Sequence, residues 1–250
     1  MPADLERARE LVAGGGVVAL TGAGISTDSG IPDFRGPQGL WTKDPEAERM
    51  SDISYYLSDP NIRKKSWQHR LTAPAWTAEP NPGHRALVDL ELAGLLTDLL
   101  TQNIDGLHQL AGSSAERVVE LHGTMRDSIC MTCGDRRDMQ IVLDRVRAGE
   151  EDPPCTECGG ILKSATVSFG QQLDPENLWR AETAARAANV FLAIGSSLGV
   201  YPVAALVPIA AQMGAEVIIV NADPTPYDDL AEVVLRGSIS EVLPQLIPIP

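Results

Sequence analysis

The sequence is poor in aromatic residues, in histidine and in basic side chains. Of its 250 residues only 4% are Phe, Trp or Tyr, four are His, and 34 Asp and Glu outnumber 20 Lys and Arg, which gives a formal charge of −14. It also has no uninterrupted apolar run of the roughly 18 residues that a membrane-spanning helix needs. A chain this acidic repels the phosphate backbone of nucleic acids. We therefore expect neither a membrane protein nor a direct nucleic-acid binder.

Apolar residues are plentiful by contrast. They make up 44% of the chain, enough for the core of one large domain or of a domain with a smaller one. The first ten residues, MPADLERARE, are charged and lack the apolar segment of a secretory signal, so we expect a cytoplasmic protein. The acidic surface tolerates basic peptides as partners, although the need for a solvated surface also explains the charge.

The four cysteines form two CxxC pairs, Cys130 with Cys133 and Cys155 with Cys158, separated by 21 residues. Four thiolates complete a tetrahedral shell with no position open for water, so the pattern predicts one structural zinc ion in a zinc ribbon. Disulfides or a redox dithiol suit a cytoplasmic chain less well. Such ribbons also dock nucleic acids or proteins, but residues 134–154 carry six acidic side chains against four arginines, which does not favour DNA.

Short apolar runs alternate with segments of helical periodicity. The first predicted helix has apolar residues at Leu5, Ala8, Leu11 and Val12, and a triple glycine ends it. The predicted strands are 17–20, 95–100, 118–121, 166–169, 190–194, 217–220 and 233–235, and the predicted helices include 82–93, 175–188 and 203–213. Apolar strands separated by helices predict an α/β fold, a Rossmann-like doubly wound parallel sheet with both faces covered.

Two stretches interrupt this alternation, and we expect them to form a smaller domain beside the sheet. One is a charged and aromatic insertion at 44–78, expected to be helical, and the other is the zinc segment at 125–164. The Rossmann-like domain then comprises 1–43, 79–124 and 165–250.

Polar clusters follow five of the predicted strands, at the edge where open parallel sheets bind ligands. They are Gly22-Ala23-Gly24-Ile25-Ser26, Gln102-Asn103-Ile104-Asp105, His122-Gly123, Gly195-Ser196-Ser197 and Asn221-Ala222-Asp223. The first resembles the dinucleotide fingerprint GxGxxG, since two glycines let the backbone approach a pyrophosphate, but Thr27 takes the third glycine position. No acidic strand end follows about twenty residues on, as a hydride-transferring enzyme needs. The chain runs instead into Ile31–Pro37, a loop suited to closing over a ligand.

The order of motifs resembles that of the bacterial-type sirtuins, which are NAD-dependent protein lysine deacylases. GAGIST-x-SGIPDFRG, TQNIDGLH-x-x-AG, ELHG, the paired CxxC, SFG, GSSL and the Asn221 segment occur in that family's order over about residues 15–243. The resemblance implies that the acyl oxygen of an acylated lysine attacks the nicotinamide ribose of NAD and expels nicotinamide. The O-alkylamidate so formed is resolved to free lysine and O-acyl-ADP-ribose.

By this resemblance His122 is the base that deprotonates a ribose hydroxyl, which agrees with an imidazole that titrates near neutral pH at a strand end. A half-buried histidine bonded to the backbone is the structural alternative. His108 is expected to be structural, and His69 and His84 carry no signal.

The resemblance also assigns the NAD contacts. Ala23, Gly24 and Thr27 face the phosphates, Phe34 shields the reacting ribose carbon, and Arg35 orders the closing loop. Asn103 holds the ribose and a water as the second catalytic residue. Ile104 and Asp105 recognise the nicotinamide amide, for which the carboxylate supplies an acceptor, and Asp105 also suits a helix N-cap. Ser196 and Ser197 lie on the ribose phosphate side, Asn221 and Asp223 contact the adenosine ribose, and Ile239 lies by the adenine. Gly22, Asp33, Trp41, Gln102 and Gly195 complete the set.

The acyl-peptide is expected as an added strand in the cleft between the domains, where it pairs mainly through its backbone. Its expected contacts are Val167, Phe169, Gly170 and Val200. Gln171 and Ser164 replace a glutamate and a proline of the commoner family pattern, which bears on local substrate preference.

Acyl specificity turns on the helical insertion. Sirtuins that remove negatively charged acyl groups carry Tyr-x-x-Arg there, and this chain has Trp67-x-x-Arg70. Arg70 either pairs with a carboxylate or lies on a solvated helix face. Deacetylation is the expected reaction, with succinyl and longer groups open.

Two other functions stay open. A protein mono-ADP-ribosyltransferase or NAD hydrolase would use the same NAD site without acyl-lysine. A non-catalytic NAD or ADP-ribose sensor would dock partners through the zinc ribbon, but it needs no base, so His122 and Asn103 count against it.

Overall fold

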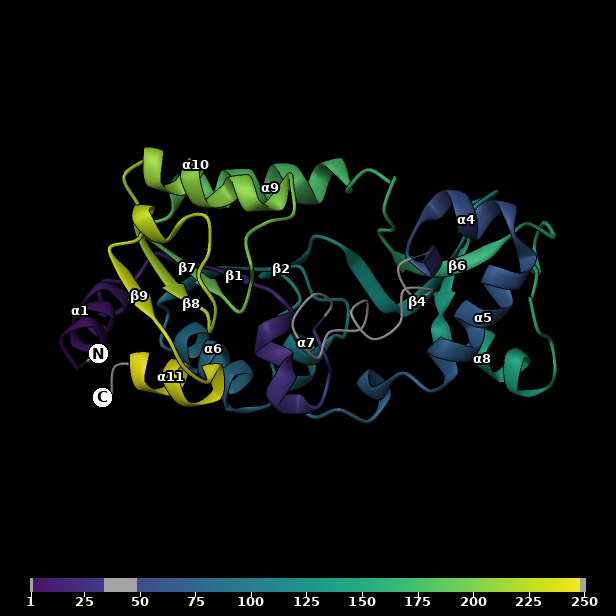
Figure 1. Ribbon diagram of the computed structural model, residues 1–250, viewed down its shortest axis with the longest axis horizontal. Helices are drawn as coiled ribbons and strands as arrows, with labels where there is room; N and C mark the ends of the chain where they lie inside the picture. The colour runs from purple at the N-terminus through teal and green to yellow at the C-terminus, as the bar shows by residue number, and fades with distance from the viewer. Residues whose placement is uncertain (1, 34–48, 248–250) are drawn as a thin grey trace.

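One parallel sheet dominates the structure, a computed structural model that describes residues 2–33 and 49–247 (Figure 1). Its six strands lie in the order β3-β2-β1-β7-β8-β9. They are β1 Val17–Thr21, β2 Leu96–Thr101, β3 Val118–Glu120, β7 Val190–Ile194, β8 Glu216–Val220 and β9 Val233–Leu235. Because β1 pairs with β2 on one side and with β7 on the other, strand order reverses there. This is the switch point at which open α/β sheets bind ligands.

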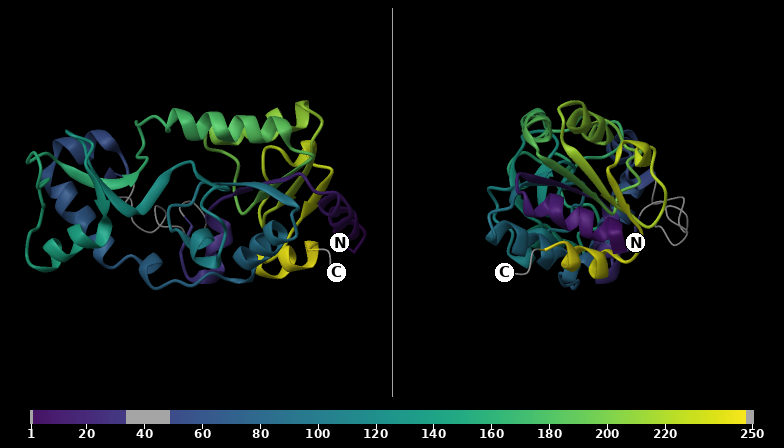
Figure 2. Two further views of the ribbon diagram at one scale, coloured as in Figure 1. Left: turned by 180° about the vertical axis from the view of Figure 1, so that it is seen from behind. Right: turned by 90° about the vertical axis from the view of Figure 1, so that its left-hand side faces the viewer.

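Helices cover both faces of this sheet (Figures 1 and 2). One face carries α1 Pro2–Ala13, α6 Pro82–Leu92 and α11 Ile239–Leu246, and the other carries α9 Pro175–Ala187 and α10 Leu206–Gln212, which follows the short η3 Val203–Ala205. Alternate residues of β1 serve the two cores, Val17 and Ala19 the first, Val18 and Leu20 the second. A strand buried on both faces must be apolar throughout, which explains its unbroken hydrophobic run. Within residues 2–33 and 49–247, every helix is too short or too polar to span a lipid bilayer.

A second sheet and its helices lie at the other end of the molecule (Figure 1). The antiparallel strands run in the order β5-β4-β6, with β4 Gly123–Cys130, β5 Arg136–Asp138 and β6 Leu162–Thr166. Around them lie α4 Ile53–Ser58, α5 Pro60–Leu71, η2 Pro74–Trp76 and α8 Met139–Arg147. Trp67 of α5, Val142 and Leu143 of α8 and Leu162 of β6 form a hydrophobic core separate from those of the parallel sheet.

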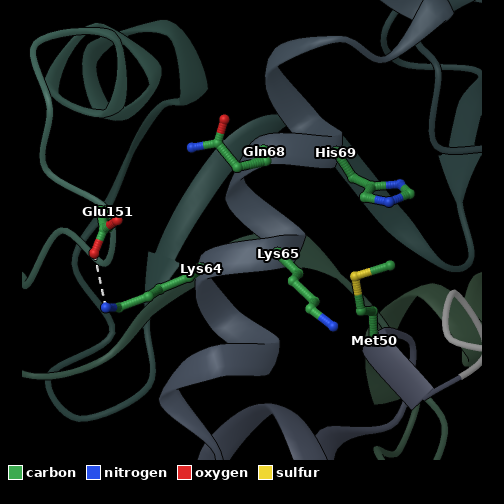
Figure 3. Close-up of a pocket in the computed structure, with 6 residues that line it drawn as sticks. All are labelled: Met50, Lys64, Lys65, Gln68, His69 and Glu151. Carbon is green, nitrogen blue, oxygen red and sulfur yellow. Dashed lines mark hydrogen bonds and ion pairs between the residues drawn. The ribbon is translucent and has the colours of Figure 1, made fainter.

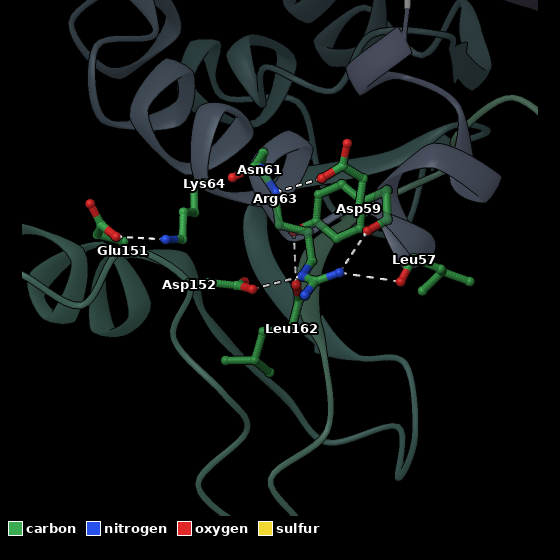
Figure 4. Close-up of polar contacts among 9 residues, drawn as sticks. Leu57, Asp59, Asn61, Arg63, Lys64, Glu151, Asp152 and Leu162 are labelled. Atoms are coloured by element: carbon green, nitrogen blue, oxygen red, sulfur yellow. Dashed lines mark hydrogen bonds and ion pairs between the residues drawn. The ribbon is translucent and has the colours of Figure 1, made fainter.

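The helical insertion is bound to the zinc segment by polar contacts (Figure 4). Arg63 of α5 donates from Nε to Asp152 Oδ2 at 2.8 Å and from Nη1 to the carbonyls of Tyr56 and Leu57, both at 3.2 Å. The Tyr56 hydroxyl donates to the carbonyl of Leu162 at 2.8 Å. Segments about 90 residues apart in sequence are thereby joined into one packed unit.

The structure confirms the α/β fold and the predicted strands of the parallel sheet, with one exception. The strand predicted at 166–169 is wrong, because the strand in this region is β6, which ends at Thr166 and pairs antiparallel with β4. The backbone turns after it, where Gly170 adopts φ +82° and Gln171 N–H donates to the Ser168 carbonyl at 3.0 Å. Val167 and Phe169 therefore flank a turn.

The remaining elements are short. They are η1 Ala23–Ser29, α7 Leu107–Ala111 and η4 Asp228–Leu230. The helix predicted at 203–213 is divided between η3 and α10.

Candidate active site

Two loops meet at the switch point, the glycine-rich loop after β1 and the Gly195 loop after β7. Gly24 N–H donates to the Gly195 carbonyl at 2.8 Å, and Gly22 N–H to the Ile194 carbonyl at 2.9 Å. Gly195 has φ +61°, and a Cβ there would lie 2.6 Å from the nitrogen of Ile25. The loops can approach this closely only without side chains, so these glycines hold the two loops together.

Hydrogen bonds connect the loops that follow neighbouring strands. Gln102, after β2, donates from Nε2 to Ser196 Oγ after β7 at 2.9 Å. Asn103 donates from Nδ2 to the Gly22 carbonyl at 3.1 Å and to Ser26 Oγ at 3.2 Å. The predicted clusters after β1, β2 and β7 therefore form one continuous polar surface, in which Asn103 and Ser196 are each 8% exposed.

His122 joins this surface from the end of β3. Its Nδ1 lies 3.0 Å from the carbonyl oxygen of Gln102. A carbonyl oxygen only accepts, so Nδ1 carries the proton and Nε2 keeps its lone pair. Burial lowers the pKa of His122 below its usual value of 6.5, against the opposing effect of the Gln102 hydrogen bond. At neutral pH the ring is thus uncharged, and Nε2 is the nitrogen that can accept a proton.

Asp105 is 5% exposed and held on both carboxylate oxygens. Oδ1 accepts from the N–H of Leu107, the first residue of α7, at 2.9 Å, and Oδ2 accepts from Ser26 Oγ at 2.8 Å. The N-cap of α7 is Gly106, so Asp105 lies one residue before the cap that the sequence predicted for it. Each oxygen retains a further lone pair for a ligand amide. The carboxylate is therefore fixed in orientation before any ligand arrives.

Two buried histidines, His84 and His108, lie under this network, and a structural role was predicted only for His108. His108 Nε2 lies 2.9 Å from Thr21 Oγ1, in line with a structural role. His84, which carried no signal, accepts from Asn81 N–H through Nδ1 at 3.3 Å and faces Ser26 Oγ with Nε2 at 3.4 Å. The Asn-x-x-His spacing of this capping box at the start of α6 was the available clue.

The loop after β8 holds the residues predicted for the adenosine ribose. Asn221 Nδ2 donates to the Asp223 carbonyl at 2.8 Å, and Arg236 Nη1 donates to the carbonyls of Asn221 and Asp223 at 2.9 and 2.8 Å. Arg236 was not predicted. Ile239, at the start of α11, packs towards Gly195, where a Cβ would meet its Cδ1 at 2.8 Å. This places Ile239 at the same edge of the sheet.

The predicted peptide contacts are only partly brought together. Val167 N–H donates to the His122 carbonyl at 2.8 Å, which ties one side of the expected cleft to the predicted base. Phe169 uses both main-chain groups against Ser51 and Ile53, at 2.8 and 3.0 Å. Val200 follows the Gly195 loop, where its carbonyl accepts from Ala204 N–H at 2.9 Å. Phe34, Arg35 and Trp41 lie outside the described residues.

The four cysteines converge on one point. Their Sγ atoms all lie within 4.8 Å of one another, with Cys130 to Cys158 at 3.5 Å and Cys133 to Cys155 at 3.8 Å. A tetrahedral zinc ion with Zn–S bonds of about 2.3 Å requires sulfur–sulfur edges of about 3.8 Å, whereas a disulfide requires about 2.05 Å. The arrangement fits the predicted structural zinc ion and no disulfide.

Outside the strand ends, a hollow of about 290 Å³ opens on the exposed side of α5 (Figure 3). Its lining residues are Met50, Lys64, Lys65, Gln68, His69 and Glu151, and none belongs to the predicted site.

Arg70 of the same helix is not on a solvated face. Its Nε is enclosed, its Cζ lies 6.0 Å from the centre of the Trp67 ring, and burial lowers its pKa.

The fold and the site define a class of α/β protein. Its Rossmann-like sheet has loops suited to ligand binding at the switch point, and a four-thiolate metal site lies at the smaller sheet beside it. The model of the Sir2 family matches residues 22–202, and the chain belongs to that family.

Its relatives include NAD-dependent protein deacetylase 2 of Streptomyces coelicolor, which is 55% identical over 231 residues, 92% of this chain and 96% of the relative. NAD-dependent protein deacetylase 1 of Pyrobaculum aerophilum is 44% identical over 233 residues, 92% and 88% of the two chains. A solved Sir2 enzyme matches with a TM-score of 0.89 at 41% identity, over 99% of this chain and 97% of that one. A Sir2 structure with a deacetylated p53 peptide and 3′-O-acetyl ADP-ribose also matches at 0.89, with 34% identity and coverage of 97% and 96%.

Proposed function

We propose that this chain removes acyl groups, acetyl groups first, from lysine side chains of proteins, with NAD as the cosubstrate and nicotinamide and O-acyl-ADP-ribose as products. The observation that carries the proposal is the neutral His122 ring, whose Nδ1 is bonded to the Gln102 carbonyl while Nε2 is left as a base. The deacetylases and peptide complexes among its relatives support it. NAD supplies a reactive bond between nicotinamide and ribose when bound.

Each loop then has a distinct task in binding and proton transfer. The glycine loop and Ser196 hold the phosphates and the ribose next to them. Asp105, oriented by Ser26 and Leu107 N–H, accepts from the nicotinamide amide. Asn103 orients the ribose, and His122 Nε2 takes a proton from a ribose hydroxyl. The peptide lies along the Val167 segment, adjacent to the His122 carbonyl.

We propose the same domain limits that the sequence predicts. Residues 1–43, 79–124 and 165–250 form the domain that holds NAD, and residues 44–78 with 125–164 form a smaller domain around a structural zinc ion. The separate hydrophobic core and the Arg63–Asp152 contact support this division. β4 begins at Gly123 and β6 ends at Thr166, each two residues from the proposed limits. The cytoplasm is the location we favour, since four unpaired thiols at one point suit a reducing compartment.

Mass spectrometry of acetyl-, butyryl- and succinyl-lysine peptides, incubated with the protein with and without NAD, tests the activity. The expected result is NAD-dependent loss of the acetyl group with formation of O-acetyl-ADP-ribose, and the other two peptides rank the acyl preference. Intact peptides with falling NAD and rising nicotinamide would replace the proposal by ADP-ribosyl transfer or NAD hydrolysis. If the peptides and NAD both stayed intact, the proposal would be replaced by the non-catalytic NAD or ADP-ribose sensor.

A further inference from the structure

Arg126, near the start of β4, contacts the loop that carries Asp105. Its Nε and Nη2 donate to the Asp105 carbonyl oxygen at 3.0 and 2.7 Å. The Asp105 carbonyl thus receives two hydrogen bonds from a charged donor, and such bonds are stronger than bonds from neutral groups. Arg126 itself is half-buried. The proposed reaction uses Asp105 and gives Arg126 no task.

The start of β4 holds two successive carbonyls of this loop. Met125 N–H donates to the Ile104 carbonyl at 2.9 Å, and Arg126 holds the next one. The following residue, Gly106, has φ +75°, and a Cβ on it would lie 3.0 Å from Arg126 Nε. The Asp105 carbonyl and the Leu107 N–H lie on either side of Gly106, in the same short turn. The Asp105 carboxylate binds that N–H at 2.9 Å, so the position of the carbonyl affects the position of the carboxylate. Release of the carbonyl would loosen the carboxylate as well.

The other side of the guanidinium faces the helical insertion. Nη2 also donates to the Ala75 carbonyl of η2 at 3.2 Å, and Cζ lies 5.1 Å from the centre of the Trp76 ring. Trp76 Nε1 in turn donates to the Arg70 carbonyl at the end of α5 at 2.6 Å. One side chain thus connects the Asp105 loop of the parallel sheet with the end of the helical insertion.

We propose that Arg126 is a positioning residue that sets the Asp105 carboxylate for nicotinamide and links that loop to the helical insertion. The inference rests on the proposed function, because it takes Asp105 as the acceptor for the nicotinamide amide. It predicts a defect confined to the nicotinamide half of the site, because the guanidinium of Arg126 donates to the carbonyls of Asp105 and Ala75.

The test compares Arg126→Gln and Arg126→Lys with a matched control, Arg117→Gln. Arg117 also donates to two carbonyls, those of Leu96 and Thr97 at 3.0 and 2.8 Å, but at the opposite end of β2. In Arg126→Gln, the KM for NAD and the inhibition constant of nicotinamide should both rise about tenfold, while the KM for an acetyl-lysine peptide changes less than about twofold. Arg126→Lys, which keeps the charge over Trp76 and one donor, should recover most of the loss. Arg117→Gln should leave all three constants unchanged.

Asp105→Asn, measured alongside, separates two kinds of failure. If it raises the nicotinamide inhibition constant but Arg126→Gln and Arg126→Lys match Arg117→Gln, the positioning role is wrong and the proposed function stands. An equal rise in the KM for NAD and for the peptide in Arg126→Gln would also overturn the inference, as evidence of general disruption. If Asp105→Asn leaves nicotinamide inhibition unchanged, the proposed task of Asp105 is wrong, and the role of Arg126 falls with it.

Discussion

His84 and His108 lie against each other beneath the glycine loop, with ring centres 5.0 Å apart and planes inclined by 58°. Both are buried, and burial lowers the pKa of His84 to about 4 and that of His108 to about 3, from the usual 6.5. The nearby Asp105 carboxylate opposes the shift only at His84. The floor of the site therefore contains two imidazoles that stay neutral in the folded protein.

This pair predicts a loss of stability in mild acid. Below pH 6.5 the unfolded chain binds protons at both rings, while the folded chain does not until about pH 4 at His84 and about pH 3 at His108. The free energy of unfolding should therefore fall as the pH falls from 6.5 towards 4, by about 1.4 kcal/mol per pH unit for each ring. Urea unfolding at pH 7.0 and 5.5 measures it. His108→Gln should reduce the slope, and His69→Gln, which changes an exposed ring, should not; equal slopes in all three proteins would contradict the interpretation.

The protonation of His122 predicts the shape of the pH–rate profile. The base must be neutral, and burial places its pKa below 6.5, so kcat/KM should rise with pH and level off with a midpoint below 6.5. His122→Ala should lose about 10²- to 10⁴-fold in turnover and retain NAD binding. Calorimetric titration with NAD and a pH series of kcat/KM check both points. A midpoint above 6.5, or full turnover in His122→Ala, would exclude His122 as this base.

The contact between the two glycine-containing loops predicts a defect in NAD binding. Gly195 and Gly94 both have positive φ, +61° and +72°, so alanine at either position carries the same kind of backbone strain, about 1 kcal/mol. At Gly195 the added Cβ also collides with the nitrogen of Ile25 at 2.6 Å, whereas at Gly94 it enters open space. Gly195→Ala should raise the KM for NAD at least about tenfold and Gly94→Ala should not. Similar KM values in the two variants would mean that the loop contact is not required for binding.

The thiolate cluster predicts one zinc ion per chain. Cys155 is buried and Thr156 beside it is exposed, so Cys155→Ser should abolish zinc retention and lower the Tm, while Thr156→Ala should change neither. Atomic emission measures the zinc content and circular dichroism the melting. Activity should disappear with the metal because the zinc segment packs against α5. A Cys155→Ser protein with a full zinc content would rule out this ligand set.

The parallel sheet could be predicted closely because its strands are buried on both faces. The run 17–20 is apolar at every position and bounded by glycines, so period and boundary agree, and β1 differs from it by one residue. The same reasoning failed at 166–169. Val167 and Phe169 alternate as a strand does, but the chain turns locally at Gly170, and the strand that does form, β6, is determined by pairing with β4, about 40 residues away.

For the site, motif order predicted which loops meet, whereas the side chains that support those loops were missed. Arg236 and Arg126 act on carbonyl oxygens, and a carbonyl has no signature in the sequence. His84 acts through Ser26, 58 residues earlier in the chain. Such residues become visible only once the fold has determined which backbone atoms lie beside them.

The central position of β1 in the sheet has a consequence for folding during synthesis. β1 is complete at residue 21, and its second neighbour, β7, begins at Val190. A ribosome adding about 5 to 20 residues per second needs roughly ten to thirty seconds to deliver that partner. Until then one edge of this strand, which is buried at every position in the folded protein, has no strand to pair with, a state that favours association with other chains. During this interval the nascent chain can bind chaperones or other chains through that open edge.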